Sequence, residues 1–437
     1  MMILILIIYC VAAGLLILFG INCHLLVHLF KHRLSGKDDE NRHLLYSFYD
    51  QHGEEELPAV TTQVPIYNEM NVAERVIDAV AAFDYPAGKH YIQVLDDSTD
   101  ETREIVADKV KALKGEGVQI EHVTRPTREG FKAGALKYGL DKARGEFLAI
   151  FDADFVPPSD FLLKTIPHFV LDASVGLVQA RWGHLNTDES LVTRLQAIGI
   201  NGHFVVEQPA RNWNDLFMNF NGTAGVFRKR AVVDAGNWEG DTLTEDLDLS
   251  YRMQLAGWRC RYLIDLVAPA ELPRDINAFK SQQFRWAKGS IQTSIKLLPR
   301  VWRSDCSLFK KVQATFHMTH YVVNLLMLYL AVMAVPLLLS TRLDLPSFAF
   351  AVFGILLFLS CTGPSRLYWA SERYVFGGRT KKMFLLPCLV MFGCGLAINN
   401  AYAVLEGIWG TKSDFIRTPK RGGGQKRHYR VAATPLF

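Results

Sequence analysis

The stretch FLAIFDADFVPP at residues 147–158 decides the fold of the central part of this chain. Its first five residues are apolar, which is enough for a short buried strand, and the chain then runs straight into Asp152 and Asp154. Two carboxylates at i and i+2 beyond a strand end can turn their oxygens toward one hard cation, Mg²⁺ or Mn²⁺. The alternative is two solvated acids in the turn that leads to Pro157 and Pro158.

Apolar runs bounded by turn residues alternate with helix-length segments on the N-terminal side of this stretch. Such alternation is typical of βαβ units, and it predicts an α/β fold with a largely parallel sheet. We expect Pro65 to end the first strand because proline cannot donate to a sheet. The expected strands are 59–64, 91–95, 118–123 and 147–151, and the expected helices are 71–83, 99–113 and 132–143.

Polar residues follow three of these strands at their carboxyl ends, which is where open α/β sheets bind ligands. A helix cap at Ser98 or Thr99 accounts for part of the segment LDDSTDET, 95–102. It does not account for the two acids before the cap, which repel each other unless a donor or a ligand offsets their charge. The polar residues at the strand ends are Asn68, Glu69, Asp96, Asp97, Asp152 and Asp154.

Glu245 and Asp246 open the segment EDLDLSYRMQLAGW, whose pattern predicts a helix. One interpretation makes a carboxylate of this pair a general base at the floor of a cleft, where a modestly raised pKa suits proton removal from a hydroxyl group. The simpler interpretation is a helix cap at Thr244 or Asp246, with acids placed at the positive end of the helix.

The segment QQFRW, 282–286, places Gln282, Arg285 and Trp286 at i, i+3 and i+4, on one face of a helix. An arginine can neutralise a phosphate, and a tryptophan face can stack on a sugar ring. The alternative is an interfacial helix whose tryptophan lies at a membrane surface, because a long apolar run begins about thirty residues later.

The hydrophobic fraction of 49% is gathered into runs that are long enough to cross a bilayer. The first run ends at Phe30 and is followed by Lys31, His32 and Arg33, which indicates an uncleaved signal anchor with the following domain in the cytoplasm. Further runs occupy 318–340, 348–361 and 383–405. We expect an anchor at 1–30, a catalytic domain at 57–300, a membrane region at 312–406 and a basic tail at 411–437.

Charge and cysteine content exclude several classes of protein. A net charge of +4 and the lack of a basic patch interleaved with aromatics argue against nucleic acid as a partner. The seven cysteines have no metal-ligand spacing, which argues against a zinc site and a disulfide framework. The basic tail is the one lopsided segment, and it is suited to anionic headgroups or phosphates.

Taken in order, the DxD, TED and QxxRW motifs, preceded by VPIYNE at 64–69, resemble the processive family-2 glycosyltransferases. These include the cellulose, mannan, chitin and hyaluronan synthases, and the resemblance runs from about Pro58 to Ser290. The segment VQARWGHLN, 178–186, resembles the subgroup of plant mannan and xyloglucan-backbone synthases. The resemblance implies a GT-A-type nucleotide-sugar-binding domain with flanking transmembrane helices.

The resemblance also implies a role for individual residues. Asp246 would be the catalytic base, with Glu245 beside it, and Asp152 and Asp154 would hold Mg²⁺ or Mn²⁺. The implied donor-binding residues are Tyr67, Glu69, Asp96, Asp97, Lys132, Asp152 and Arg285. The implied acceptor-binding residues are Gly222, Thr223, Gln282 and Trp286, and a gating segment at 414–420 would act through Phe415, Thr418 and Lys420.

The implied function is a membrane-bound, metal-dependent, inverting transfer of glucose or mannose from a UDP- or GDP-sugar to a growing polysaccharide. One rival hypothesis is the transfer of a single sugar to a membrane lipid, and another is a non-catalytic membrane scaffold. The implied partners are the nucleotide-sugar, a glycan or glycolipid acceptor, and membrane lipids. One inconsistency concerns topology: an anchor followed by three crossings places the basic tail outside, so one segment is re-entrant or interfacial, or a further crossing exists.

Overall fold

The structure is a computed structural model that describes residues 2–340, 347–378, 382–410 and 422. Its chain divides into two compact units. The sheet unit comprises residues 38–193, 218–281 and 414–437, and the helical unit comprises 1–37, 194–217 and 282–413.

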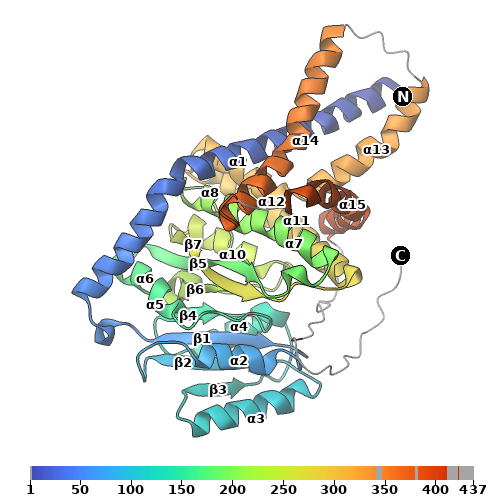
Figure 1. The fold of residues 1–437 in the computed structure, drawn as a ribbon. Helices are drawn as coiled ribbons and strands as arrows, with labels where there is room; N and C mark the ends of the chain where they lie inside the picture. Colours follow the sequence, from blue (N-terminus) through green and yellow to red (C-terminus); the bar gives the residue numbers. More distant parts are fainter. Residues whose placement is uncertain (1, 341–346, 379–381, 411–421, 423–437) are drawn as a thin grey trace. The chain divides into compact units, whose positions relative to one another are not determined.

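The sheet unit is built on a seven-stranded mixed sheet of order β3-β2-β1-β4-β6-β5-β7 (Figure 1). The pairs β1–β2, β1–β4, β2–β3 and β5–β7 are parallel, whereas β6 runs antiparallel to both of its neighbours, β4 and β5. The strands are β1 (Val60–Ile66), β2 (His90–Asp96), β3 (Ile120–Val123), β4 (Phe147–Ile150), β5 (Val175–His184), β6 (Gly225–Arg228) and β7 (Arg259–Ala270).

Helices cover both faces of this sheet. Successive strand residues point to opposite sides, and buried apolar side chains on each side pack against helices. On β4, Ala149 belongs to one hydrophobic core, whereas Leu148 and Ile150 belong to the other. The first core includes residues of α2 (Ala73–Ala81), α3 (Thr102–Gly115), α5 (Phe161–Thr165) and α6 (Pro167–Leu171). The second core includes residues of α4 (Phe131–Lys142), α9 (Lys229–Asp234) and α10 (Glu245–Leu255).

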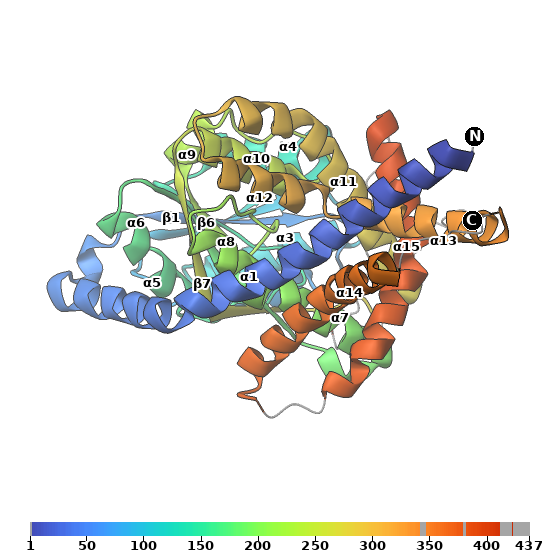
Figure 2. The same cartoon turned by 90° about the horizontal axis from the view of Figure 1, so that it is seen from above.

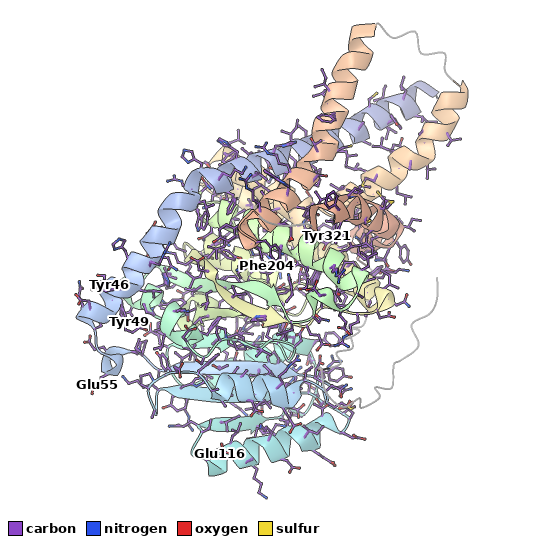
Figure 3. The ribbon with its side chains drawn as sticks, viewed as in Figure 1. Tyr46, Tyr49, Glu55, Glu116, Phe204 and Tyr321 are labelled. Atoms are coloured by element: carbon purple, nitrogen blue, oxygen red, sulfur yellow. The ribbon has the colours of Figure 1, made fainter. Side chains whose placement is uncertain are left out.

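Shorter elements and one side chain complete the sheet unit. Two 3₁₀ turns, η1 (Glu54–Glu56) and η2 (Thr187–Glu189), lie in its loops. Tyr49, labelled in Figure 3, lies near the end of α1 (Met2–Gln51) and donates its hydroxyl to the Leu163 carbonyl at 2.7 Å. This bond fastens the last turns of α1 to α5.

The four predicted strands and three predicted helices are confirmed, with three differences. Strand β1 continues through Pro65 to Ile66, because its pairing with β4 ends at Gln63 and the missing N–H leaves no partner on that side. Helix α3 begins at Thr102, where Asp100 accepts the backbone N–H at 3.0 Å, so the cap expected at Ser98 or Thr99 is wrong. The strands β5, β6 and β7 were not predicted, and β6 is antiparallel to its neighbours.

The helical unit contains the long apolar helices of the chain. Within the described residues, Ile5–Leu34 of α1 and the whole of α15 (Leu386–Trp409) are long and apolar enough to cross a membrane. A third candidate is the bent pair formed by α12 (Leu308–Thr319) and Val322–Pro336 of α13 (Val322–Ser340), which meet at 67°. Helices α13 and α15 pack side by side (Figure 2).

The remaining elements of this unit are α7 (Leu191–Asn201), the π-helix η3 (Gly202–Glu207), α8 (Gln208–Asn212), α11 (Ile276–Arg303), α14 (Ser347–Val375) and η4 (Lys382–Leu385). Helix α14 has 29 residues and runs through Pro364, so the apolar run predicted to end at residue 361 continues as helix. The polar residues that follow Cys361 hid this continuation, since they end the apolar run but not the helix.

Candidate active site

Lys132, Asp152 and Gly222 meet at the carboxyl end of β4. The Lys132 ammonium donates to Asp152 Oδ1 at 2.5 Å and to the Gly222 carbonyl at 2.7 Å. Burial alone would lower the pKa of Lys132, but the charges of Asp152, Glu245 and Asp246 outweigh it and raise that pKa. Lys132 is therefore a fixed positive charge among carboxylates.

Asp246 lies in the first turn of α10, close to the same lysine. A Cβ atom added at Gly222 would lie 3.2 Å from Asp246 Oδ2 and 3.4 Å from Lys132 Nζ. Both charged groups therefore lie close to the backbone of this glycine. Burial and the charge of Glu245 raise the pKa of Asp246 to about 7, against the lowering effect of the Leu247 N–H bond and of Lys132. A carboxylate with such a pKa suits general-base catalysis near neutral pH.

The loop that carries Gly222 and Thr223 is held from β5 by a residue that sequence reasoning missed. The buried Gln179 amide nitrogen donates to the carbonyls of Thr223 and Ala224 at 3.1 and 3.0 Å, and Gln179 Oε1 accepts the Asn221 N–H at 3.2 Å. Thr223 in turn accepts the backbone N–H of Asp152 at 2.9 Å. The segment 178–186 that marked the subgroup therefore contains a residue that shapes the site.

Asp96 and Asp97, at the end of β2, each have a cationic or imidazole partner. His122 Nε2 lies 2.8 Å from Asp96 Oδ2, and the Ser98 N–H donates to Asp96 Oδ1 at 2.8 Å. Burial would raise the pKa of Asp96, but these bonds lower it overall. Asp97 is paired with Arg125 through two hydrogen bonds of 2.7 and 2.6 Å. These partners offset the repulsion that the two adjacent acids imply.

Tyr67, Asn68 and Glu69 follow β1 in a turn held by hydrogen bonds. Asn68 has a φ of +53°, and its side chain accepts the Thr99 N–H at 2.8 Å. The Arg128 guanidinium lies 3.4 Å from the centre of the Tyr67 ring, a cation–π contact that sequence reasoning did not anticipate. The Glu69 carbonyl accepts the first N–H groups of the α2 segment, from Val72 and Ala73.

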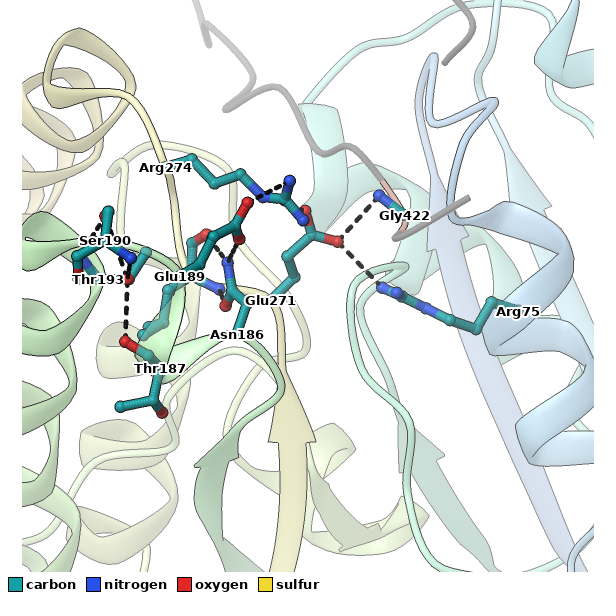
Figure 4. A network of polar contacts seen from close by, with 10 residues as sticks. Arg75, Asn186, Thr187, Glu189, Ser190, Thr193, Glu271, Arg274 and Gly422 are labelled. Carbon is teal, nitrogen blue, oxygen red and sulfur yellow. Dashed lines mark hydrogen bonds and ion pairs between the residues drawn. The ribbon is translucent and has the colours of Figure 1, made fainter. Parts of the chain in front are cut away.

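Asp154 contacts Arg75. Arg75 belongs to a polar network with Glu271 and Gly422, which Figure 4 shows. The Asp154 carbonyl accepts from Arg75 at 3.4 Å, and Arg75 contacts the buried Glu271 carboxylate at 3.5 Å. Glu271 also accepts the Gly422 N–H at 3.0 Å. The network thus holds the backbone of the acidic loop and one residue of the C-terminal tail.

Asp152 and Asp154 offer two hard carboxylate ligands beyond one strand end, which is the donor set that Mg²⁺ or Mn²⁺ takes when it also binds a diphosphate. A second acidic group comprises Glu239, Asp241 and Asp248, with oxygens within 4.8 Å of one another. In that group Arg252 contacts Asp248 at 2.6 Å and Glu239 at 3.7 Å, and both Asp248 and Arg252 are buried. A basic side chain therefore contacts one carboxylate in each group, Lys132 in the first and Arg252 in the second.

Gln282, Arg285 and Trp286 lie on α11 in the helical unit, and all three are half-buried. Among the described residues, Gln282 Oε1 is a buried oxygen without a hydrogen-bond partner. A buried oxygen of this kind is suited to receive a donor from a ligand. The predicted gating residues Phe415, Thr418 and Lys420 lie outside the described residues.

Comparisons with known proteins show the family of this chain. Residues 58–289 match the family described as glycosyltransferase like family 2. A glucomannan 4-beta-mannosyltransferase of Arabidopsis thaliana is 33% identical over 391 residues, which cover 87% of this chain and 72% of that protein. A glucomannan 4-beta-mannosyltransferase of Oryza sativa subsp. japonica is 41% identical over 270 residues, 61% of this chain, and the match spans only 52% of that protein.

Among solved structures, a mannosyltransferase from Pyrobaculum calidifontis in complex with GDP-Man and Mn²⁺ has a TM-score of 0.57 and 19% identity, and the match covers 91% of this chain and 100% of that one. At this identity the likeness shows the GT-A fold. The fold and the matches define the protein as a hexosyltransferase with membrane helices. The chain belongs to glycosyltransferase family 2, on its cellulose synthase-like side.

Proposed function

We propose that this chain is an inverting β-mannosyltransferase that extends a β-linked polysaccharide from GDP-mannose. The observation that carries the proposal is the cluster of Asp246, Lys132 and Asp152 around Gly222. It combines a carboxylate of pKa about 7 with a fixed cation and a further carboxylate at a strand end. The choice of mannose and of GDP rests on the activities named for the two plant relatives and on the ligand of the archaeal structure.

In the proposed reaction, an Asp246 oxygen takes the proton of an acceptor hydroxyl while the hydroxyl oxygen attacks the anomeric carbon. The bond from that carbon to the diphosphate oxygen breaks on the opposite face, so an α-linked donor gives a β-linked product. Asp246 then releases its proton to solvent, and the nucleoside diphosphate leaves with the bonding electrons. Proton removal by a positioned base contributes typically 10²- to 10⁴-fold to such a rate.

Asp152 and Asp154 would hold a divalent cation, Mg²⁺ or Mn²⁺. When bound, the cation neutralises charge on the leaving diphosphate. Lys132 would add a positive charge of the protein beside the diphosphate. Its ammonium contacts Asp152, which would be one ligand of the cation. Asp97 would accept from the nucleobase, Tyr67 and Glu69 would flank the nucleoside, and Arg285 would contact the diphosphate.

The acceptor would lie against Gly222 and Thr223, where the absence of a side chain leaves room beside Asp246. Gln282 would donate to or accept from the sugar, and Trp286 would stack on it. Lys31 and Arg33, near the end of the first candidate span, favour a cytoplasmic catalytic domain, within the predicted range 57–300. The other proposed partners are a glycan acceptor and the membrane lipids around the candidate spans.

The test is a donor screen on purified membranes containing the full chain, with product size and linkage analysis. GDP-mannose should be incorporated into a β-linked polymer, and Asp246→Asn should lower the rate by about 10²- to 10⁴-fold. Asp108→Asn, an exposed acid on α3, is the matched control and should leave the rate unchanged. A lipid-extractable monoglycoside would instead support glycolipid synthesis, and near-normal rates for Asp246→Asn would exclude it as the base.

A further inference from the structure

Helices α11 and α15 meet along a seam of three contacts inside the helical unit. From one contact to the next the residue numbers rise on both helices, so α11 and α15 run in the same direction at the seam. The contacts are Phe284 with Tyr402, whose ring centres lie 6.1 Å apart, Lys288 Nζ with Glu406 Oε2 at 2.7 Å, and Ile291 with Gly407.

The central contact places a charge pair in an apolar setting. Lys288 is fully buried, and Glu406 belongs to α15, one of the candidate membrane spans. Charged residues inside membrane segments are costly and are kept where they serve a function. A buried ion pair also adds little net stability compared with apolar residues of the same volume, although loss of one partner is strongly destabilising. The pair therefore serves to fix position more than to add stability.

Gly407 lets the helices approach closely beside this pair. A Cβ atom at this position would lie 3.0 Å from both Ile291 Cβ and the Lys288 carbonyl oxygen. Small residues at helix interfaces in membranes allow such close packing. Any larger residue would push α11 away from α15 at the level of the ion pair.

The seam lies on the face of α11 opposite to the QxxRW motif. At 3.6 residues per turn, the mean direction of Phe284, Lys288 and Ile291 is roughly 150° from that of Gln282, Arg285 and Trp286. Tyr321, labelled in Figure 3, holds the helix from another side, since its hydroxyl donates to Gln283 Oε1 at 3.3 Å. One face of α11 is thus locked while the opposite face carries the motif.

We propose that Lys288 and Glu406 are positioning residues whose ion pair fixes the QxxRW face of α11 for acceptor binding. This inference rests on the proposed function, because it assigns Gln282 and Trp286 to the acceptor. Loss of the pair should weaken acceptor binding and shorten the product. Nucleotide binding depends mainly on the sheet unit, with Arg285 as its one proposed contact on α11, and should weaken less than acceptor binding.

The test compares Lys288→Met, Glu406→Gln and the exchanged pair Lys288→Glu/Glu406→Lys in the full chain. Binding of mannohexaose is followed by intrinsic tryptophan fluorescence, binding of GDP with Mn²⁺ is measured separately, and product length is measured from GDP-mannose. The single variants should weaken mannohexaose binding about tenfold and shorten the product, with a smaller loss of GDP affinity. The exchanged pair should recover most of both losses.

Gly407→Ala tests the seam without removing a charge. It should reproduce the loss of mannohexaose binding, whereas Gly395→Ala on the same helix, where an added Cβ meets nothing within 4 Å, should not. The proposal would be overturned if the single variants and Gly407→Ala kept the wild-type mannohexaose affinity and product length. It would also be overturned if all variants failed to fold and the exchanged pair recovered nothing. Absence of sugar transfer by the wild type would contradict the proposed function instead, while the binding measurements would still decide the role of the seam.

Discussion

Arg125 and Asp97 form a two-pronged ion pair, with Nε to Oδ1 at 2.7 Å and Nη2 to Oδ2 at 2.6 Å, and each side chain is only 8% exposed. The same guanidinium donates to the carbonyls of Glu129 and Phe131 at 2.6 and 2.7 Å. Phe131 begins α4, and Lys132 follows it. Arg125 therefore joins the end of β2 to the turn that presents the lysine of the site.

Arg125→Lys should raise the donor KM about tenfold with a smaller change in kcat, because lysine keeps the charge but cannot form the paired bonds that orient Asp97. Arg125→Met should cost more, since Asp97 would then be left buried without its cation. Nucleotide titration with GDP and with GMP checks the effect directly. Arg103→Lys, on the exposed side of α3, should behave as wild type. A fall in kcat with unchanged donor KM would contradict a role in donor positioning.

Glu245→Gln should move the acid limb of the pH–rate profile to lower pH. Asp246 works as a base in its deprotonated form, so the rate rises as pH passes its pKa of about 7. Burial is the larger cause of that raised pKa, and Glu245 is the second. Removing the Glu245 charge therefore lowers the pKa, and the variant should be relatively faster than wild type at pH 6. The profile of kcat/KM measures this shift, and Glu104→Gln on α3 should leave it in place.

Gly222→Ala should lower activity more than Gly257→Ala does, although the two variants should lose similar stability. Gly222 has a φ of +83°, and an added Cβ would stand 3.2 Å from Asp246 Oδ2. Gly257 at the end of α10 has a similar φ of +93° with nothing within 4 Å, so Gly257→Ala carries the backbone strain alone, about 1–2 kcal/mol. Thermal unfolding should show comparable losses for the two variants. Equal activities would indicate that space beside Asp246 is not needed by the acceptor.

The sequence predicted the parts of the molecule that have a local pattern. Short apolar runs followed by polar residues predicted the strands β1, β2 and β4, and they also predicted that Asp97 and Asp152 lie at strand ends. Both predictions use only neighbouring residues, because strand periodicity and strand-end chemistry are local. The strand β6 escaped, since its four residues pair with β4 and β5 through contacts far apart in sequence. The full length of helix α14 was not predicted, because polar residues after position 361 end the apolar run although the helix continues.

The site residues that escaped prediction act through long-range side-chain contacts. Gln179 reaches the Thr223 carbonyl from β5, 44 residues away in sequence, and Glu271 contacts Arg75 across 196 residues. No spacing rule connects such pairs. His122 and Arg125 could have been suspected, because adjacent acids such as Asp96 and Asp97 require cationic or donor partners.

Asp154→Asn should prevent the restoration of sugar transfer by added metal that Glu239→Gln retains. In each acidic group of the sheet unit a basic side chain already contacts one carboxylate, Lys132 at Asp152 and Arg252 at Asp248, so metal binding has to separate the two groups. After treatment with EDTA, wild-type and Glu239→Gln membranes should lose activity and regain it on addition of Mn²⁺ or Mg²⁺. Asp154→Asn should stay inactive at the concentration that restores wild type and should need a higher one for any recovery. Binding of Mn²⁺ followed by electron paramagnetic resonance separates the two groups without relying on turnover, and loss of the bound-ion signal in Glu239→Gln alone would assign the cation to the second group.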